Sequence, residues 1–286
     1  MGGRPRPLNA PSPKQHRREF PFWLLAAILL GLLFCWLFVA NGDYRTIFSA
    51  LRHGIFTTAW VSVVAYVAAA LIGLVVAVGR GSRLRLIREV APFYVEIVRG
   101  VPVLVLLFYV AFVGAPALVV AWDWLAAYPI AWGLLPELTV RGFDMTARAI
   151  FALTISYSAF LSEIFRAGFE SVPRTQIEGA YALGLSRVAT FRFVIFPQAF
   201  RTVLPPLGND FVAMIKDSAL VSSLGVQDIT QIGKVYSAST FLFFQTYNVV
   251  AFLYLVMTLS LSLTVRALEQ YLKQHGWAGT GQGRDG

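Results

Sequence analysis

Hydrophobic residues in this 286-residue chain gather in long runs that are separated by short polar segments. The runs are about 20 residues long, the length that an α-helix needs to cross the ~30 Å hydrocarbon core of a bilayer. Soluble helices and strands alternate apolar and polar positions instead. The pattern therefore predicts an all-α integral membrane protein with about six transmembrane helices. The predicted spans are residues 22–40, 55–78, 101–121, 146–165, 195–222 and 245–266.

The fifth predicted span departs from a plain apolar run. It combines charged residues with two adjacent prolines, namely Arg201, Pro205, Pro206, Asp210, Lys216 and Asp217. Proline lacks a backbone N–H, so we expect the two prolines to kink or break the helix. Charged side chains are costly in lipid, so we expect the polar residues of this span to face protein or water.

The distribution of Lys and Arg predicts the orientation. These residues lie mainly before the first span, after the second, after the fourth and after the sixth. Because cytoplasmic loops carry the excess of Lys and Arg, both termini are predicted to be cytoplasmic. This requires an even number of spans and so supports the fifth. A basic start before an apolar run also fits a signal peptide, but residues 22–40 are longer than a signal core and no cleavage site follows them, which favours an anchor.

Composition narrows the function classes. Hydrophobic residues make up 57% of the chain and charged residues 14%, and the net charge of +9 lies between the spans, so it does not indicate a nucleic-acid partner. The single cysteine, Cys35, cannot form an internal disulfide. The three histidines are too scattered to indicate a metal site. The sequence has no GxxxxGK[ST], HExxH or GxSxG motif, so we expect neither ATP binding nor enzymatic activity.

The segment between the fourth and fifth spans, residues 171–193, has the pattern of two short helices. Thr175 and Glu178 are spaced as a capping box at the start of the first helix. Gly184 is expected to end that helix, and Ser186 to cap the second. The pair either forms a docking surface for a cytoplasmic partner or lies flat on the lipid surface. The periodicity alone leaves both interpretations open.

The same segment resembles the EAA motif of permease subunits of type I ABC importers. The residues that match the motif are Glu178, Ala180, Gly184, Val194, Phe196 and Pro197, while Gly179 stands where the motif has alanine. The flanks are similar to the polar amino-acid branch of that family (histidine, glutamate, glutamine, arginine and opine transporters). The flanking segments are Arg99–Pro102, Ser162–Gly168, Pro197–Arg201 and Leu204–Val226. The resemblance covers residues 50–268 and leaves the first span outside it.

The resemblance implies a permease subunit of an ATP-binding-cassette importer that carries polar amino acids across a bacterial inner membrane by alternating access. The partners it implies are a cytoplasmic ABC ATPase dimer that uses ATP and Mg, a second permease subunit (a homodimer or a paralogous chain), a periplasmic or lipid-anchored amino-acid-binding protein, and membrane lipids. The chain itself is expected to bind no cofactor. The residues that the resemblance assigns to ATPase coupling are Glu178, Gly179, Ala180, Gly184, Leu185 and Arg187.

The implied organisation begins with a disordered cytoplasmic tail at residues 1–19 and a transmembrane anchor with an outer loop at 20–52. The importer domain follows at 53–268, with the coupling loop at about 171–193, and a flexible cytoplasmic tail ends the chain at 269–286. The second span also carries small residues at every fourth position, which favours close helix packing within the chain.

Polar residues of the fourth and fifth spans are candidates for the substrate route. They are Ser156, Glu163, Asn209, Asp210, Lys216 and Asp217. Asp210 and Asp217 are seven positions apart and share a helix face, so they could offer acceptors to a zwitterion. A structural alternative is a local pair of Lys216 and Asp217 that fixes the bundle. For the cargo, an opine or another small polar solute is an alternative. An ion-coupled secondary transporter is the rival class, but it would be expected to show an internal repeat and none is evident.

Overall fold

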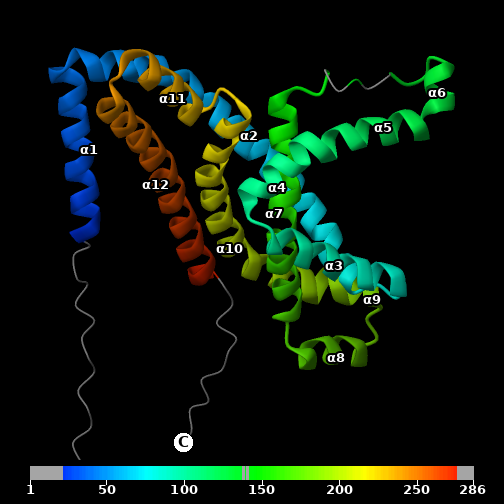
Figure 1. Ribbon diagram of the computed structural model, residues 1–286. Helices are drawn as coiled ribbons and strands as arrows, with labels where there is room; N and C mark the ends of the chain where they lie inside the picture. The colour runs from blue at the N-terminus through cyan, green and yellow to red at the C-terminus, as the bar shows by residue number, and fades with distance from the viewer. Residues whose placement is uncertain (1–21, 137–138, 140–141, 276–286) are drawn as a thin grey trace, which may run out of the picture. The chain divides into compact units, whose positions relative to one another are not determined.

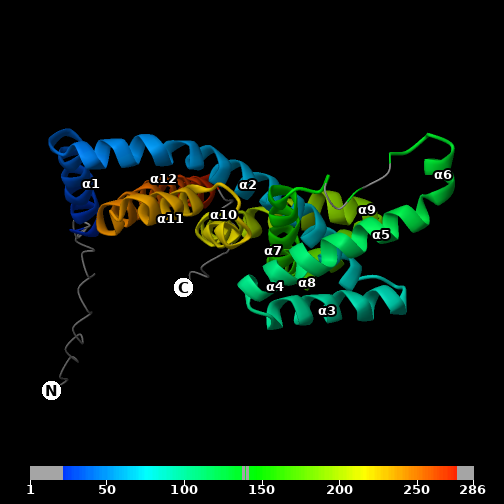
Figure 2. The same ribbon diagram turned by 45° about the horizontal axis from the view of Figure 1, so that its top comes forward.

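The computed structural model describes residues 22–136, 139 and 142–275, and the regular elements in that part of the chain are all helices (Figure 1, Figure 2). The all-α class is thereby confirmed. The chain divides into two compact units, residues 1–45 and 46–286. The predicted tail at 1–19 lies outside the described residues, and so does the second predicted tail except for residues 269–275, which are helical.

The first unit contains helix α1 (Phe22–Ala40) and the beginning of helix α2 (Gly42–Arg80). Helix α1 has the bounds predicted for the first span. Two side chains close the turn that follows it. Asn41 Oδ1 accepts a hydrogen bond from the backbone N–H of Asp43 (2.9 Å), and the Arg45 guanidinium donates to the last carbonyl oxygens of α1 (3.2 and 3.4 Å). Because these bonds satisfy both helix ends, α2 starts at once, and the part of the predicted outer loop from Gly42 onwards is helical.

The second unit holds the remaining helices. Their bounds are α3 Arg85–Gly100, α4 Val103–Tyr109, η1 Val110–Gly114, α5 Ala115–Leu125, α6 Ala127–Ala131, α7 Met145–Glu170, α8 Arg174–Ala182, α9 Arg187–Thr190, η2 Phe191–Ile195, α10 Phe196–Asp217, η3 Ser218–Leu224, α11 Ile229–Thr240 and α12 Phe243–His275. η1 and η2 are π-helical turns, and η3 is a 3-10 helix. Among the described residues, α2, the run Val103–Leu125, α7 and α12 are long and apolar enough to cross a bilayer.

Helix α10 corresponds to the fifth predicted span. It is long enough to cross a bilayer, but it is less apolar than the other spans. Pro205 and Pro206 were predicted to kink or break this helix; the helix is continuous, so a break is wrong. The helix packs against both α7 and α12. Gly168 of α7 and Gly208 of α10 lie so close to a valine of the facing helix that an added Cβ would come within 2.1 Å and 2.7 Å of its methyl groups. This packing holds α10 in shape despite the two missing donors.

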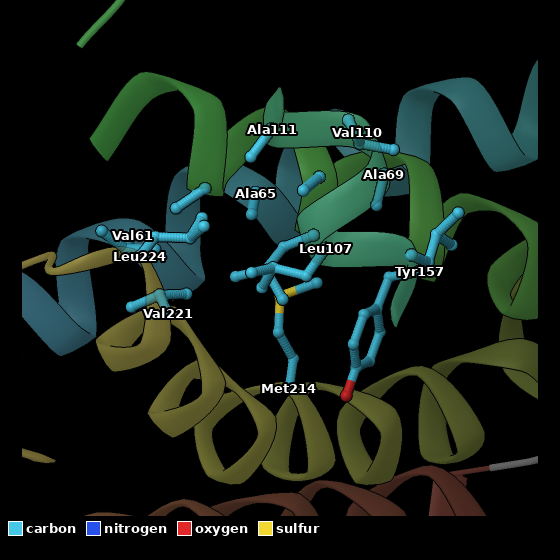
Figure 3. Close-up of a cluster of buried hydrophobic side chains, with 14 of the residues drawn as sticks. Val61, Ala65, Ala69, Leu107, Val110, Ala111, Tyr157, Met214, Val221 and Leu224 are labelled. Atoms are coloured by element: carbon cyan, nitrogen blue, oxygen red, sulfur yellow. The ribbon is translucent and has the colours of Figure 1, made fainter. Parts of the chain in front are cut away.

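The core of the second unit lies where α2, α4, α7 and α10 meet (Figure 3). The small residues of α2 are part of it, since Ala65 and Ala69 are fully buried. A Cβ on Gly73 would lie 2.8 Å from the carbonyl oxygen of Ser158 on α7. Met214 reaches from α10 into the same cluster (Figure 3). The small residues therefore allow close packing of helices within the chain, as predicted.

Close backbone packing at Gly54 leads to a stability prediction. A Cβ at this position of α2 would lie 2.6 Å from the backbone nitrogen of Ile229 and 2.8 Å from the carbonyl carbon of Asp228. Backbone atoms cannot rotate away, so we expect Gly54→Ala to destabilise the protein by about 1–3 kcal/mol. Thermal unfolding in detergent measures this. Gly42→Ala on the same helix meets no atom within 4 Å and is the matched control. Equal unfolding midpoints for the two variants would contradict the close contact.

Candidate functional site

Helix α8 follows α7 after a short turn and lies at its lower end in Figure 1. Pro173 precedes the helix, and no side chain caps it. The predicted capping box is therefore wrong, because Thr175 lies inside the first turn. The helix ends as predicted at Gly184, whose φ of 80° is left-handed. The N–H of Leu185 donates to the carbonyl oxygen of Ala180 (3.1 Å), which completes a glycine-dependent helix end.

The second helix of the pair starts as predicted. Ser186 Oγ accepts a hydrogen bond from the N–H of Ala189 (3.3 Å). The helix does not stop after one turn, because α9, η2 and α10 follow one another directly over residues 187–217. Gln198 Nε2 of α10 donates to Gln176 Oε1 of α8 (2.7 Å). Helix α8 is therefore held between two long helices, α7 before it and α10 after it.

The pair presents an exposed surface that mixes apolar and charged side chains. Leu183 is 84% exposed and Val188 77%. Of the predicted coupling residues, Glu178, Gly179, Gly184 and Arg187 are exposed, Leu185 is half-buried and Ala180 is buried. Exposed apolar side chains gathered at the end of a helical segment are typical of a docking surface. A Cβ on Gly179 would meet no atom within 4 Å, so this departure from the motif leaves α8 intact.

A cluster of four charged residues joins the end of α2 to the last turns of α7. Arg80 forms an ion pair with Glu163. Arg166 donates to Glu163 through Nε (2.9 Å) and Nη2 (2.7 Å), and to Glu170 through Nη1 (2.5 Å). The side chains of Arg80 and Glu163 are 21% and 20% exposed. Glu163, a predicted residue of the substrate route, is thus engaged by two arginines directly before the α8 turn.

The two acidic residues of α10 lie on the side that faces α7. Asp217 Oδ2 accepts a hydrogen bond from the Tyr157 hydroxyl (2.8 Å), and Figure 3 shows this hydroxyl directed towards α10. Asp210 has a buried oxygen, Oδ2, without a hydrogen-bond partner among the described residues. Lys216 is exposed, and the described residues include no ion pair between it and Asp217. The local Lys216–Asp217 pair is therefore wrong.

The predicted route residues do not form one cluster. Ser156 Oγ donates to the backbone carbonyl of Ala152 (2.9 Å), and Asn209 is exposed on the face of α10 that also carries Lys216. Sequence reasoning missed two tyrosines on the neighbouring helices, Tyr157 and Tyr66. The Tyr66 hydroxyl donates to the backbone carbonyl oxygen of Leu207 in α10 (2.5 Å). A tyrosine inside an apolar span needs a hydrogen-bond partner for its hydroxyl. The presence of Tyr66 and Tyr157 in predicted spans therefore indicated polar contacts between helices.

In the part of the chain that the structure describes, four helices that are long and apolar enough to cross a bilayer, with an exposed helix pair between α7 and α10, indicate a multi-pass membrane protein. The family model for the binding-protein-dependent transport system inner membrane component matches residues 69–275. The chain belongs to this family.

Two relatives and two solved structures agree with this assignment. The chain is 32% identical to the glutamine transport system permease protein GlnP of Escherichia coli (strain K12), over 81% of this chain and 98% of GlnP. It is 30% identical to the probable amino-acid permease protein YxeN of Bacillus subtilis (strain 168), over 79% and 93%. An amino acid ABC transporter crystallised with histidines matches with a TM-score of 0.66 at 30% identity, over 82% of this chain and 98% of that one. The methionine transporter MetNI matches in fold alone, with a TM-score of 0.53 at 16% identity.

The chain is therefore the membrane-spanning permease subunit of an ABC importer, and the predicted class is confirmed. The rival class of ion-coupled transporters is excluded by this membership. A member of this family is a multi-pass inner-membrane protein that works with an ATPase and a binding protein. The relatives are transporter subunits and not enzymes.

Proposed function

We propose that the chain carries polar amino acids across the cytoplasmic membrane of a bacterium by alternating access. The names of the relatives, which refer to amino acids, support this cargo. The surface of α10 supports it as well. Asp210 and Asp217 offer acceptors for an ammonium group, and the exposed Asn209 and Lys216 on the neighbouring face offer donors for a carboxylate. A zwitterion needs both kinds of partner.

The exposed helix α8 is the observation that supports the coupling step. We assign it, with Glu178 and Leu183, to the surface where a cytoplasmic ABC ATPase docks. The ATPase dimer supplies the ATP and Mg chemistry, so this chain holds no cofactor of its own. Two ATPases require two docking helices, so a second permease subunit, identical or paralogous, completes the pair. A periplasmic or lipid-anchored binding protein delivers the amino acid on the outer face, and both termini are cytoplasmic.

The contacts of α8 suggest how movement of the ATPase reaches the spans. A displacement of α8 acts directly on α7, which precedes it after a short turn. It also acts on α10 through the Gln176–Gln198 hydrogen bond and the direct helical connection over residues 187–217. These are the two helices that carry Tyr157, Asp210 and Asp217. The proposed driving surface and the proposed substrate route thus share the same two rigid elements.

Co-purification and uptake test the two parts separately. The chain is tagged and extracted in mild detergent, and an ATPase present in near-equal amount supports the coupling role. Its absence under several gentle conditions would contradict that role. The complex is then reconstituted in vesicles with its binding protein, and ATP-driven uptake of labelled glutamine, histidine, cystine and an opine is compared. Preference for the opine, or transport of none of the amino acids, would replace the proposed cargo without affecting the coupling assignment.

A further inference from the structure

Helix α3 has three distinct faces, and its buried apolar residues form the one that packs into the protein core. Ala91, Val95 and Val98 are buried, and the helix lies against α7 (Figure 2). A second face carries exposed apolar side chains at helical spacing, namely Leu86, Val90, Phe93 and Ile97. The third face is charged and contains Arg85, Arg88, Glu89, Glu96 and Arg99. An exposed apolar face beside a charged face is typical of a helix at the boundary between lipid tails and headgroups.

The apolar face of α3 borders a groove of about 500 Å³ that is lined almost entirely by apolar side chains. Its walls are Ile72 and Val75 of α2 and Leu86 and Val90 of α3, and Ile155 of α7 contributes to the lining. The α2 residues belong to the last turns before the cytoplasmic end of that span. The groove therefore lies at the depth of the inner leaflet and has the shape and polarity for an acyl chain.

The chain segment at the mouth of this groove is strongly basic. Arg83, Arg85 and Arg88 follow the end of α2 within a few residues, and all three are exposed. In the part of the chain that the structure describes, none of them takes part in an ion pair, whereas Arg80 is held by Glu163. The one acidic neighbour on this stretch is Glu89. The excess positive charge beside an apolar groove is complementary to a lipid with an anionic headgroup and not to a zwitterionic one.

We propose that the α2–α3 groove binds an anionic phospholipid of the inner leaflet. One acyl chain lies between Val75 and Val90, and Arg85 and Arg88 bind the headgroup phosphate while their stems cover apolar surface. The site occupies the same end of α2 and α7 as the four-residue charge cluster, so a bound lipid stabilises the junction from its membrane side. It is independent of the cargo and of the ATPase surface.

Photo-crosslinking in nanodiscs tests the site. The complete transporter is placed in mixtures of phosphatidylglycerol and phosphatidylcholine that contain a trace of either lipid with a photoreactive acyl chain, and labelled peptides are mapped. We expect phosphatidylglycerol to label residues 72–79 and 86–91 in preference to phosphatidylcholine. Arg85→Gln/Arg88→Gln should weaken that labelling roughly fivefold for each arginine removed. Arg52→Gln/Lys234→Gln removes the same charge from two exposed positions outside α3 and α8 and should leave it unchanged.

Two further variants make the result decisive. Val75→Trp fills the groove without changing the charge and should abolish labelling by both lipids at these peptides. A cysteine introduced at Val90 reports on protein contact. Equal labelling by the two lipids in the unsubstituted protein, or equal effects of the two double arginine variants, would reduce the groove to ordinary lipid-facing surface and overturn the proposal. Disulfide crosslinking between two copies of the Cys35→Ala/Val90→Cys variant, whose one cysteine is at position 90, would overturn it in favour of a subunit interface.

Discussion

Replacing Glu178 by alanine is expected to abolish ATP-driven uptake while membrane insertion and expression stay normal. Glu178 is exposed on α8, in the same helix pair as the exposed Leu183, and replacing its side chain removes no buried contact. If α8 seats in the ATPase, a charged residue at the centre of that contact contributes about 2 kcal/mol or more to docking. This corresponds to roughly thirtyfold weaker binding of the ATPase. The measurements are uptake into vesicles and the amount of ATPase that co-purifies with the tagged chain.

The neighbouring positions supply the controls. Gly179→Ala adds a methyl group that meets no atom within 4 Å, improves the helix propensity of α8 by up to about 1 kcal/mol and should preserve uptake. Leu183→Asp places a charge on the most exposed apolar side chain of the surface and should impair docking at least as strongly as Glu178→Ala. Normal ATP-driven uptake by both Glu178→Ala and Leu183→Asp would refute the assignment of α8 and leave the family membership untouched.

The long apolar helices could be predicted from the sequence because an apolar run of about 20 residues has the length that a helix needs to cross a bilayer, whereas soluble helices alternate apolar and polar positions. Local hydrogen bonding could be predicted in part. Gly184 ends α8 and Ser186 starts α9, since both features depend on residues that lie within one turn. The capping box was wrong because the carbonyl of Pro173 already accepts the N–H of Gln176 (3.0 Å), so the helix starts two residues earlier than the box requires.

The contacts between helices could not be predicted from the sequence. Arg80 and Glu163 are 83 residues apart, and Tyr157 and Asp217 are 60 apart, so no spacing rule connects them. The polarity of the fifth span predicted that its polar residues face protein or water, but only the packing of α10 against α7 reveals that Asp217 meets the Tyr157 hydroxyl. The continuous α10 is a similar case. Two prolines argue locally for a break, and packing on two sides outweighs them.

Neutralising Glu163 is expected to uncouple transport in a different way, from inside the permease. Glu163→Gln leaves two arginine side chains, Arg80 (21% exposed) and Arg166 (35% exposed), beside a neutral amide, which costs roughly 1–3 kcal/mol. The junction between α2 and α7 should loosen, and movement of α8 should then reach α7 without moving α2. We expect a lower unfolding midpoint, undiminished docking of the ATPase, and more ATP hydrolysed for each amino acid taken up.

Charge exchange separates this role from simple loss of a buried group. The double variant Arg80→Glu/Glu163→Arg keeps two cations and two anions in the cluster. It should therefore restore much of the stability and of the ratio of ATP hydrolysed to amino acid taken up. Arg80→Glu alone places three acids together and should be the most damaging variant. Lys234→Glu reverses the charge of an exposed lysine on α11 that has no ion pair in the described structure, and should change the coupling ratio little. If the effects of Arg80→Glu and Glu163→Arg simply add, the two side chains are not energetically coupled and the ion pair contributes nothing to the joint movement of α2 and α7. If they compensate each other, the ion pair adds to the close packing at Gly73 in making α7 and α2 move together, because the Arg80–Glu163 interaction is the one that depends on the sign of both charges.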